Sequence, residues 1–299
     1  MINKETFCSK LEEKVRELNP KASVTILEAQ KVNGVKTGIA CKVGEEVSIS
    51  KTVYYEDYMD ADERFDFVDL DTLITRVAEM LLSRDGEGEH YASMFFSIKE
   101  DKDQFLMHTH VCLLNSANEG LAYCEKSERF EGLIESYYIK IESACVWVTK
   151  QMLDYLNIGV EELRDAAFAN IFKKTKISGM MDVLTELTSD TEVICEDDNK
   201  FKKDPSGMYV VSNVERFRGA ICAENIEKLA EYLGDDLYIL PSSIHEMIAV
   251  PVHMNGDVGA SMLLSMVEEV NATQVEADER LINAVYEYSK ETKSYRRVA

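Results

Sequence analysis

Apolar positions at the start of the chain recur at helical spacing and then alternate with polar ones. The first pattern predicts an amphipathic helix with the inward positions Phe7, Leu11, Val15 and Leu18. Asn33-Gly34 lies between two alternating runs and predicts a hairpin, because both residues tolerate positive φ. A third strand is expected at 47–50 and a second helix from Asp71 to about Ser83. Residues 1–84 are therefore expected to form a helix, a three-stranded meander and a helix.

The pattern changes after this first part. Asp85 to His90 carries glycines and acidic residues without apolar periodicity, and we expect residues 85–104 to be a loop or a boundary between two parts. Phe105 to Asn115 has the character of a strand. We expect residues 105–299 to form a second part with helices and strands.

This second part contains three imperfect repeats of two strands followed by a helix. The predicted strand pairs are 133–141 with 144–148, 208–212 with 217–222, and 237–240 with 244–252. Extra helices are expected at 160–174 and 178–187. Hairpins followed by helices predict the α+β class, with antiparallel sheets and helices packed on their faces.

The charge of the chain limits its partners. Lys and Arg number 33 and Asp and Glu number 55, which gives a net charge of −22. Such a field repels nucleic-acid backbones and anionic membrane surfaces, so we expect neither direct nucleic-acid binding nor membrane binding. The simple interpretation is a solvated acidic surface. An inhibitor that mimics DNA is the alternative that charge alone suggests.

The cysteines and the N-terminus indicate a cytoplasmic protein. The 7 cysteines are scattered without a Cys-x-x-Cys pair, which favours reduced thiols over a disulfide framework or a zinc knuckle. The sequence shows no secretion signal and no apolar stretch long enough to span a bilayer. It also lacks the glycine-rich patterns that bind nucleotide phosphates, so we expect no cofactor.

One segment holds the residue types of a hydrolase. Ser243, His245 and Glu246 supply a nucleophile, a base and a carboxylate, and Ser243 and His245 share a face of an extended strand. His245 and Glu246 point to opposite faces, and the chain has no Gly-x-Ser-x-Gly elbow. Turn chemistry set by Pro241 is the interpretation that we favour.

A second set has the residue types of a zinc site. His108, His110 and Cys112 alternate along the predicted strand and would share one face. Zinc needs further ligands, and no His-Glu-x-x-His motif supplies them. We therefore expect no bound metal and read these residues as part of a half-buried strand.

Several motifs distributed along the chain carry a resemblance to a known family. They are Asn33-Gly34-Val-x-x-Gly38-Ile39, Leu113-Leu-Asn115-x-x-Asn118, Tyr238-Ile-Leu-Pro-Ser-Ser-Ile-His-Glu246 and Val285-Tyr-x-Tyr288. Through them the chain resembles the bacterial domain-of-unknown-function family 5688 over nearly its whole length. Lys51-Thr52 stands where the family carries a Pro before its first tyrosine. The resemblance implies no activity. The sequence therefore favours a binding or regulatory protein that recognises a protein or a small molecule, with a hydrolase or metal-dependent enzyme as the alternative.

Overall fold

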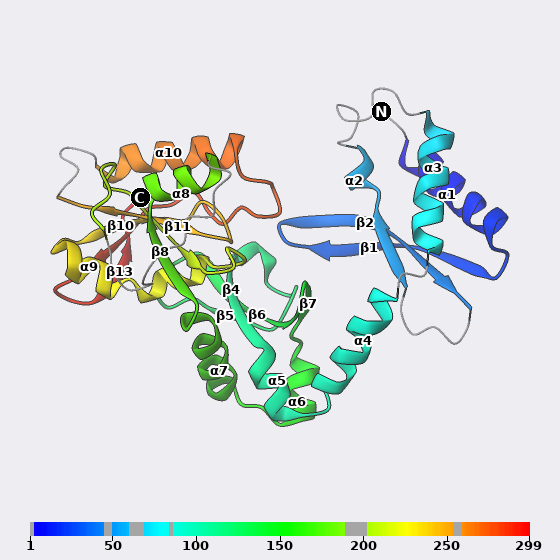
Figure 1. Cartoon of the computed structure of the whole chain (residues 1–299), viewed down its shortest axis with the longest axis horizontal. Helices are drawn as coiled ribbons and strands as arrows, with labels where there is room; N and C mark the ends of the chain where they lie inside the picture. Colours follow the sequence, from blue (N-terminus) through cyan, green and yellow to red (C-terminus); the bar gives the residue numbers. More distant parts are fainter. Residues whose placement is uncertain (1–2, 45–49, 60–68, 84–85, 189–201, 254–258) are drawn as a thin grey trace. The chain divides into compact units, whose positions relative to one another are not determined.

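The computed structural model describes residues 3–44, 50–59, 69–83, 86–188, 202–253 and 259–299. The chain forms two compact units, Met1–Ser97 and Ile98–Ala299, and each is described here by itself. The described residues form helices and three antiparallel sheets joined by turns, so the α+β class is confirmed (Figure 1). The boundary between the units lies inside the segment 85–104 that the sequence marks as a loop or boundary.

Unit 1 is a three-stranded sheet with helices. Its elements are α1 (Lys4–Leu18), β1 (Ala22–Lys31), β2 (Gly34–Val43), β3 (Lys51–Tyr54), α2 (Glu56–Met59), α3 (Leu70–Leu82) and α4 (Glu87–Ile98). Asn3 caps α1, because its side chain accepts from the Glu5 N–H at 2.8 Å. Asn33 has φ of 59° in the hairpin that joins β1 to β2. The core of this unit is formed mainly by α1, α3 and the sheet, with Phe7, Leu11, Ile39, Ile74 and Val77 buried.

Two expectations for the first part of the chain need correction. The segment 85–104, expected as a loop or a boundary, contains the boundary between the units but is largely helical, in α4 and in the start of α5 (Lys102–His108). Asp101 starts α5, since its side chain accepts from the Gln104 N–H at 3.0 Å. The strand that was expected from Phe105 therefore begins only at Thr109. The third strand of unit 1 is β3, and most of the range 47–50 lies outside the described residues.

Unit 2 begins with a small antiparallel sheet. Its strands are β4 (Thr109–Asn115), β5 (Cys124–Lys126), β6 (Leu133–Ile141) and β7 (Ala144–Trp147), in the order β4-β6-β5 with β7 also paired to β6. The helices α6 (Lys150–Leu156) and α7 (Val160–Phe172) follow. Asn170 of α7 donates to the carbonyl oxygens of Leu106, Met107 and Thr109, and so ties this helix to the start of β4.

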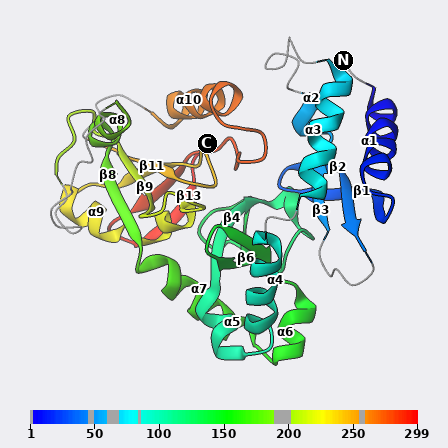
Figure 2. The same ribbon diagram turned by 45° about the vertical axis from the view of Figure 1, so that its right-hand side comes forward.

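The second sheet of unit 2 has six strands. Its order is β13 (Ser294–Arg297), β12 (Tyr286–Ser289), β10 (Leu237–Leu240), β11 (Met247–Pro251), β9 (Tyr209–Asn213) and β8 (Thr175–Gly179). The helices α9 (Glu227–Leu233) and α10 (Ala260–Thr273) lie on opposite sides of it (Figures 1 and 2). Leu263 and Val267 of α10 pack on Leu240 and Val250, while Leu237 and Ile239 are buried toward the other face.

The predicted repeats are recovered in part. The first and third strand pairs and the helices after them are confirmed as β6-β7-α6 and β10-β11-α10. The prediction of a second strand in the middle repeat, at 217–222, is wrong. Arg216 and Arg218 have φ of 49° and 51°, which is incompatible with an extended strand. A 3-10 helix, η3 (Ala220–Asn225), follows instead. Residues 175–179 form β8 beside β9, and α8 (Met180–Thr188) begins only after it. No helix in the described ranges has both the length and the apolar character needed to cross a bilayer.

Candidate functional site

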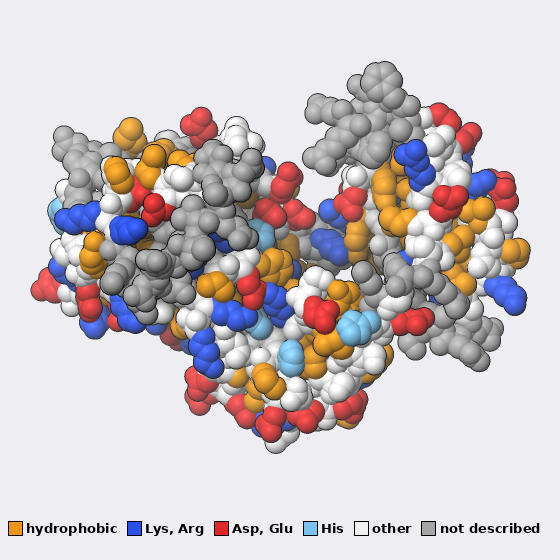
Figure 3. All heavy atoms as spheres, viewed as in Figure 1, with side chains coloured by type: hydrophobic (Ala, Val, Ile, Leu, Met, Phe, Trp, Pro, Cys, Tyr) orange, Lys and Arg blue, Asp and Glu red, His pale blue; other side chains and the backbone are white. Residues whose placement is uncertain are grey.

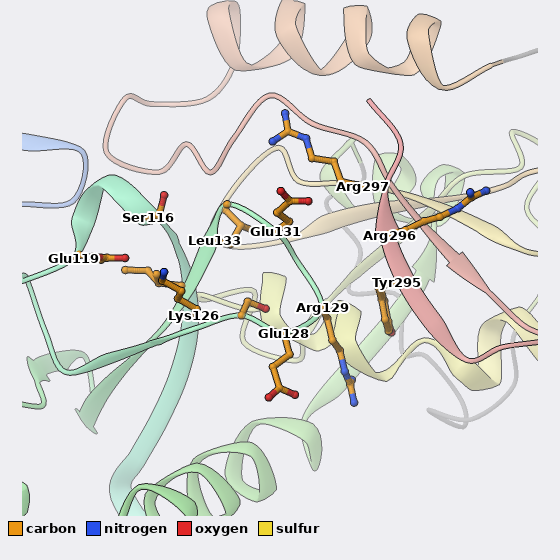
Figure 4. Close-up of a pocket in the computed structure, with 13 residues that line it drawn as sticks. Ser116, Glu119, Lys126, Glu128, Arg129, Glu131, Leu133, Tyr295, Arg296 and Arg297 are labelled. Atoms are coloured by element: carbon orange, nitrogen blue, oxygen red, sulfur yellow. The ribbon is translucent and has the colours of Figure 1, made fainter.

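Unit 2 contains a pocket of about 720 Å³, within the size range of small-molecule sites. It lies where the connection from β5 to β6 meets β13, next to the 3-10 helix η2 (Ser116–Asn118). In Figure 4, Arg129 and Tyr295 extend in one direction while Glu131 and Arg297 extend in the opposite one. The lining residues are Ser116, Glu119, 126–129, 131–134 and 295–297.

The wall of this pocket is held by aromatic packing. Phe130 is fully buried, and its ring meets those of Tyr286 and Tyr295 edge-on at 5.1 and 5.3 Å between centroids. The Tyr286 hydroxyl donates to the Glu131 carbonyl at 2.7 Å. Gly132 has φ of +91°, and a Cβ there would lie 2.9 Å from Ile282. The loop is therefore fixed in place, as a preformed binding site requires.

Charges of both signs line the pocket. Arg296 is paired with Glu287 at 2.7 Å, and Arg297 donates to the carbonyl of Ala299 at 3.1 Å. Within the described part of the chain, Lys126 and the carboxylates of Glu119, Glu128 and Glu131 have no ion-pair partner. The remaining charges of the pocket suit a ligand that carries both a cationic and an anionic group. Charges of both signs are also interspersed over the face of unit 2 in Figure 3.

Two buried carboxyl groups lie behind this wall. Glu135 of β6 and Glu224 of η3 are 1% and 3% exposed. The guanidinium groups of Arg164 and Arg129 lie 3.4 Å from Glu135 Oε1 and Glu224 Oε2 respectively. Arg129 also donates to the Glu224 carbonyl, and the Tyr295 hydroxyl donates to the Ala223 carbonyl at 3.0 Å. Both pocket residues are thus attached to η3.

Burial changes the ionisation of these carboxyl groups. Burial, reinforced by the charge of Glu135, raises the pKa of Glu224 from 4.5 to about 8. Burial also raises the pKa of Glu135, which Arg164 opposes. Protonation of Glu224 is therefore favoured at neutral pH, although Arg129 lies beside it.

The structure places the predicted hydrolase residues in hydrogen bonds with other groups. The Ser243 hydroxyl accepts from the His245 backbone N–H at 2.9 Å. The ring of His245 accepts at Nδ1 from the Arg218 N–H at 3.2 Å, so a neutral ring carries its proton on Nε2, 3.2 Å from Glu279. In this arrangement neither ring nitrogen is left to take a proton from Ser243. Glu246 is half-buried, and the carboxylate that faces the ring belongs to Glu279.

The three candidate metal ligands, His108, His110 and Cys112, do not lie on one strand. His108 ends α5 and bonds at Nδ1 to the Gln104 carbonyl at 2.8 Å. His110 and Cys112 lie on β4, and burial lowers the pKa of His110 and raises that of Cys112 to about 11. His110 stacks on Tyr138, and its Nε2 is buried without a hydrogen-bond partner. No group of three or more His, Cys, Asp and Glu side chains in the described ranges is arranged to hold a metal ion.

Comparison with known families covers nearly the whole chain. A family model described as a family of unknown function (DUF5688) matches residues 4–290. The chain belongs to this family. Searches of curated proteins and of solved structures found no match.

Residues that carry the DUF5688 resemblance shape the rim of the pocket. The Asn115 side chain accepts from the Ala117 N–H at 2.9 Å and donates to the Leu281 carbonyl at 2.8 Å. Asn118 is buried and donates to the Asn115 carbonyl at 3.0 Å. These bonds fix the turn that presents Ser116 and Glu119 to the pocket.

Sequence reasoning did not find the residues of this pocket or of the carboxyl pair. Lys126, Arg129 and Arg297 belong to no motif and come together only when the loop meets β13. One signal was available for the pair, since Glu135 interrupts the apolar run of β6. A charged residue in an otherwise buried strand indicates a partner inside the fold.

Proposed function

We propose that this protein is a binding protein whose pocket in unit 2 takes a small zwitterionic molecule, such as an amino acid or a short peptide. The observation that carries the proposal is the pocket of about 720 Å³ with both cationic and carboxylate side chains on its walls. A polar ligand with both charges can pair with Lys126 and with the carboxylates of Glu119 and Glu131.

The anchored loop supports binding as well. A wall fixed by Phe130 and Gly132 loses little conformational entropy when a ligand binds, which favours affinity. The contacts around His245 support binding rather than hydrolysis, because its ring nitrogens are engaged with Arg218 and Glu279.

A thermal-shift screen of amino acids and short peptides tests this proposal. A ligand that binds only the folded protein raises its stability, by about 2.7 kcal/mol at a hundredfold excess over Kd. We expect at least one zwitterion to raise the melting temperature of the wild type. The shift should be lost in Lys126→Met and kept in Lys150→Met, which removes an exposed lysine of α6. Equal shifts in both variants, or no shift from any zwitterion, would contradict the proposal.

A further inference from the structure

The two buried carboxyl groups behind the pocket lie close enough for each to affect the ionisation of the other. Glu224 Oε1 is buried without a hydrogen-bond partner, and Arg129 approaches the other oxygen, Oε2, at 3.4 Å. A charged carboxylate oxygen without a donor is unfavourable inside the fold, whereas a proton on Glu224 can be shared with Glu135. The geometry of the cluster therefore favours one proton on the pair.

The shared proton leaves this cluster positive. Arg129 and Arg164 contribute two positive charges, and the two carboxyl groups with one proton contribute one negative charge, which leaves one positive charge. The phenols of Tyr137 on β6 and Tyr295 on β13 are neutral, since burial raises the pKa of both. The further acids nearby are Glu128, which is exposed on the loop, and Glu227 of α9, which is partly exposed.

Arg129 connects the buried cluster with the pocket. It lines the pocket, and its side chain is 40% exposed although its partner Glu224 is buried. Its bonds to Glu224 use only Nη1, and the guanidinium lies 5.5 Å from the centre of the Tyr295 ring. A guanidinium has five N–H donors, so donors remain for an anionic group in the pocket.

We propose that Arg129, together with Lys126, binds the anionic group of the ligand, and that the proton shared by Glu135 and Glu224 sets the strength of this binding. The inference rests on the pocket being a ligand site, as proposed above. A carboxylate, sulfate or phosphate group neutralises the positive charge of the cluster. When the shared proton is lost, both carboxyl groups are ionised and the cluster has no net charge, so it no longer attracts an anion. Anion affinity therefore falls as the pH rises through neutral to about 9.

Sulfate is a suitable probe because it keeps its two negative charges over this pH range. Its Kd for the full-length protein is measured by NMR titration at pH 6.5 and pH 9.0 and constant ionic strength. We expect binding by the wild type to weaken about fivefold or more at the higher pH, as loss of one nearby charge implies. Glu224→Gln should bind with the same Kd at both pH values, since its amide cannot ionise.

Two further variants complete the design. Arg129→Met should weaken sulfate binding about tenfold at pH 6.5, because it removes the charged donor. Glu269→Gln, an exposed carboxylate of α10, makes the same chemical change as Glu224→Gln and should follow the wild type. If Glu224→Gln fails to fold, the carboxyl ¹³C resonances of the wild type report the same proton. The Glu224 signal should then titrate near pH 8, apart from the set that titrates near pH 4.5.

Each outcome decides between the two proposals. Sulfate affinity that is unchanged by pH, that changes equally in Glu224→Gln, or that survives Arg129→Met would overturn the role of the shared proton. If one of these sulfate results is found while zwitterions still bind and lose affinity in Lys126→Met, the proposed function stands and this inference fails. If neither sulfate nor any zwitterion binds the wild type, the proposed function itself fails.

Discussion

A glutamate with almost no contact with water, such as Glu224, is unfavourable in its charged form even beside an arginine. Arg129 approaches Glu224 Oε2 only to 3.4 Å, and Glu135 adds a second carboxyl group next to it. Protonation of Glu224 removes the repulsion between the two carboxylates. The pair therefore couples the folding of unit 2 to pH.

The stability of the protein should fall as the pH rises from about 5 to 9. The folded state holds a proton on the pair up to the pKa of Glu224 near 8, whereas an unfolded glutamate loses it near 4.5. The stabilisation that this proton provides is therefore complete below about pH 4.5 and is lost as the pH rises through 8. Glu224→Gln should remove this dependence and be more stable than the wild type at pH 9 by about 1–3 kcal/mol. Chemical denaturation at several pH values, with Glu269→Gln as control, measures it; parallel curves for wild type and Glu224→Gln would contradict the prediction.

At the scale of elements, local signals predicted helix starts and turns, while long-range contacts decided the rest. Asn33-Gly34 forms its hairpin, as the sequence indicates, and Gly234 ends α9 with φ of 71°. Residues 217–222 have the composition of a strand, but Gly219 lies against Ser212 and the His245 backbone with no space for a Cβ. That close contact is created by the tertiary fold, so a local pattern does not show it.

The attachment of α7 to β4 depends on one side chain. The Asn170 amide donates to the carbonyls of Leu106, Met107 and Thr109 at 2.9, 3.1 and 2.8 Å. Asn170→Ala removes the side-chain donor to these carbonyls and should lower the free energy of unfolding by about 1–3 kcal/mol. Asp165→Ala changes an exposed residue of the same helix and should cost less than about 0.5 kcal/mol. Denaturant unfolding measures both, and equal losses would show that Asn170 does not fasten the helix.

At the scale of the whole molecule, the sequence predicted the α+β class and the helix-meander-helix pattern of unit 1 but not the pocket. The fold class follows from the order in which helical and strand-like hydrophobic patterns occur along the chain, and these patterns are local. The pocket joins residues 116–134 to 295–297, and β13 carries no strand signal strong enough to place it there. A net charge of −22 also gave no indication of a site lined by Lys126, Arg129, Arg296 and Arg297.

The cysteines provide a test that covers both units. The six described cysteines are free, and Cys195 lies outside the described residues. Titration in denaturant without reductant should count about seven thiols per chain, because the spacing fits reduced thiols. In the native protein Cys112 and Cys222 should react slowest, since burial raises the pKa of each to about 11. A count near one or three from unfolded protein would indicate disulfides instead.

The central claim is that the pocket in unit 2 binds a small charged ligand. Isothermal titration calorimetry of the best zwitterion from the thermal-shift screen tests it most directly, with wild type, Lys126→Met and Lys150→Met at one pH and one salt concentration. The account predicts a Kd at least about tenfold weaker for Lys126→Met, since a pocket charge pair is lost, and a Kd within about twofold of wild type for Lys150→Met. The same Kd for all three proteins would contradict it.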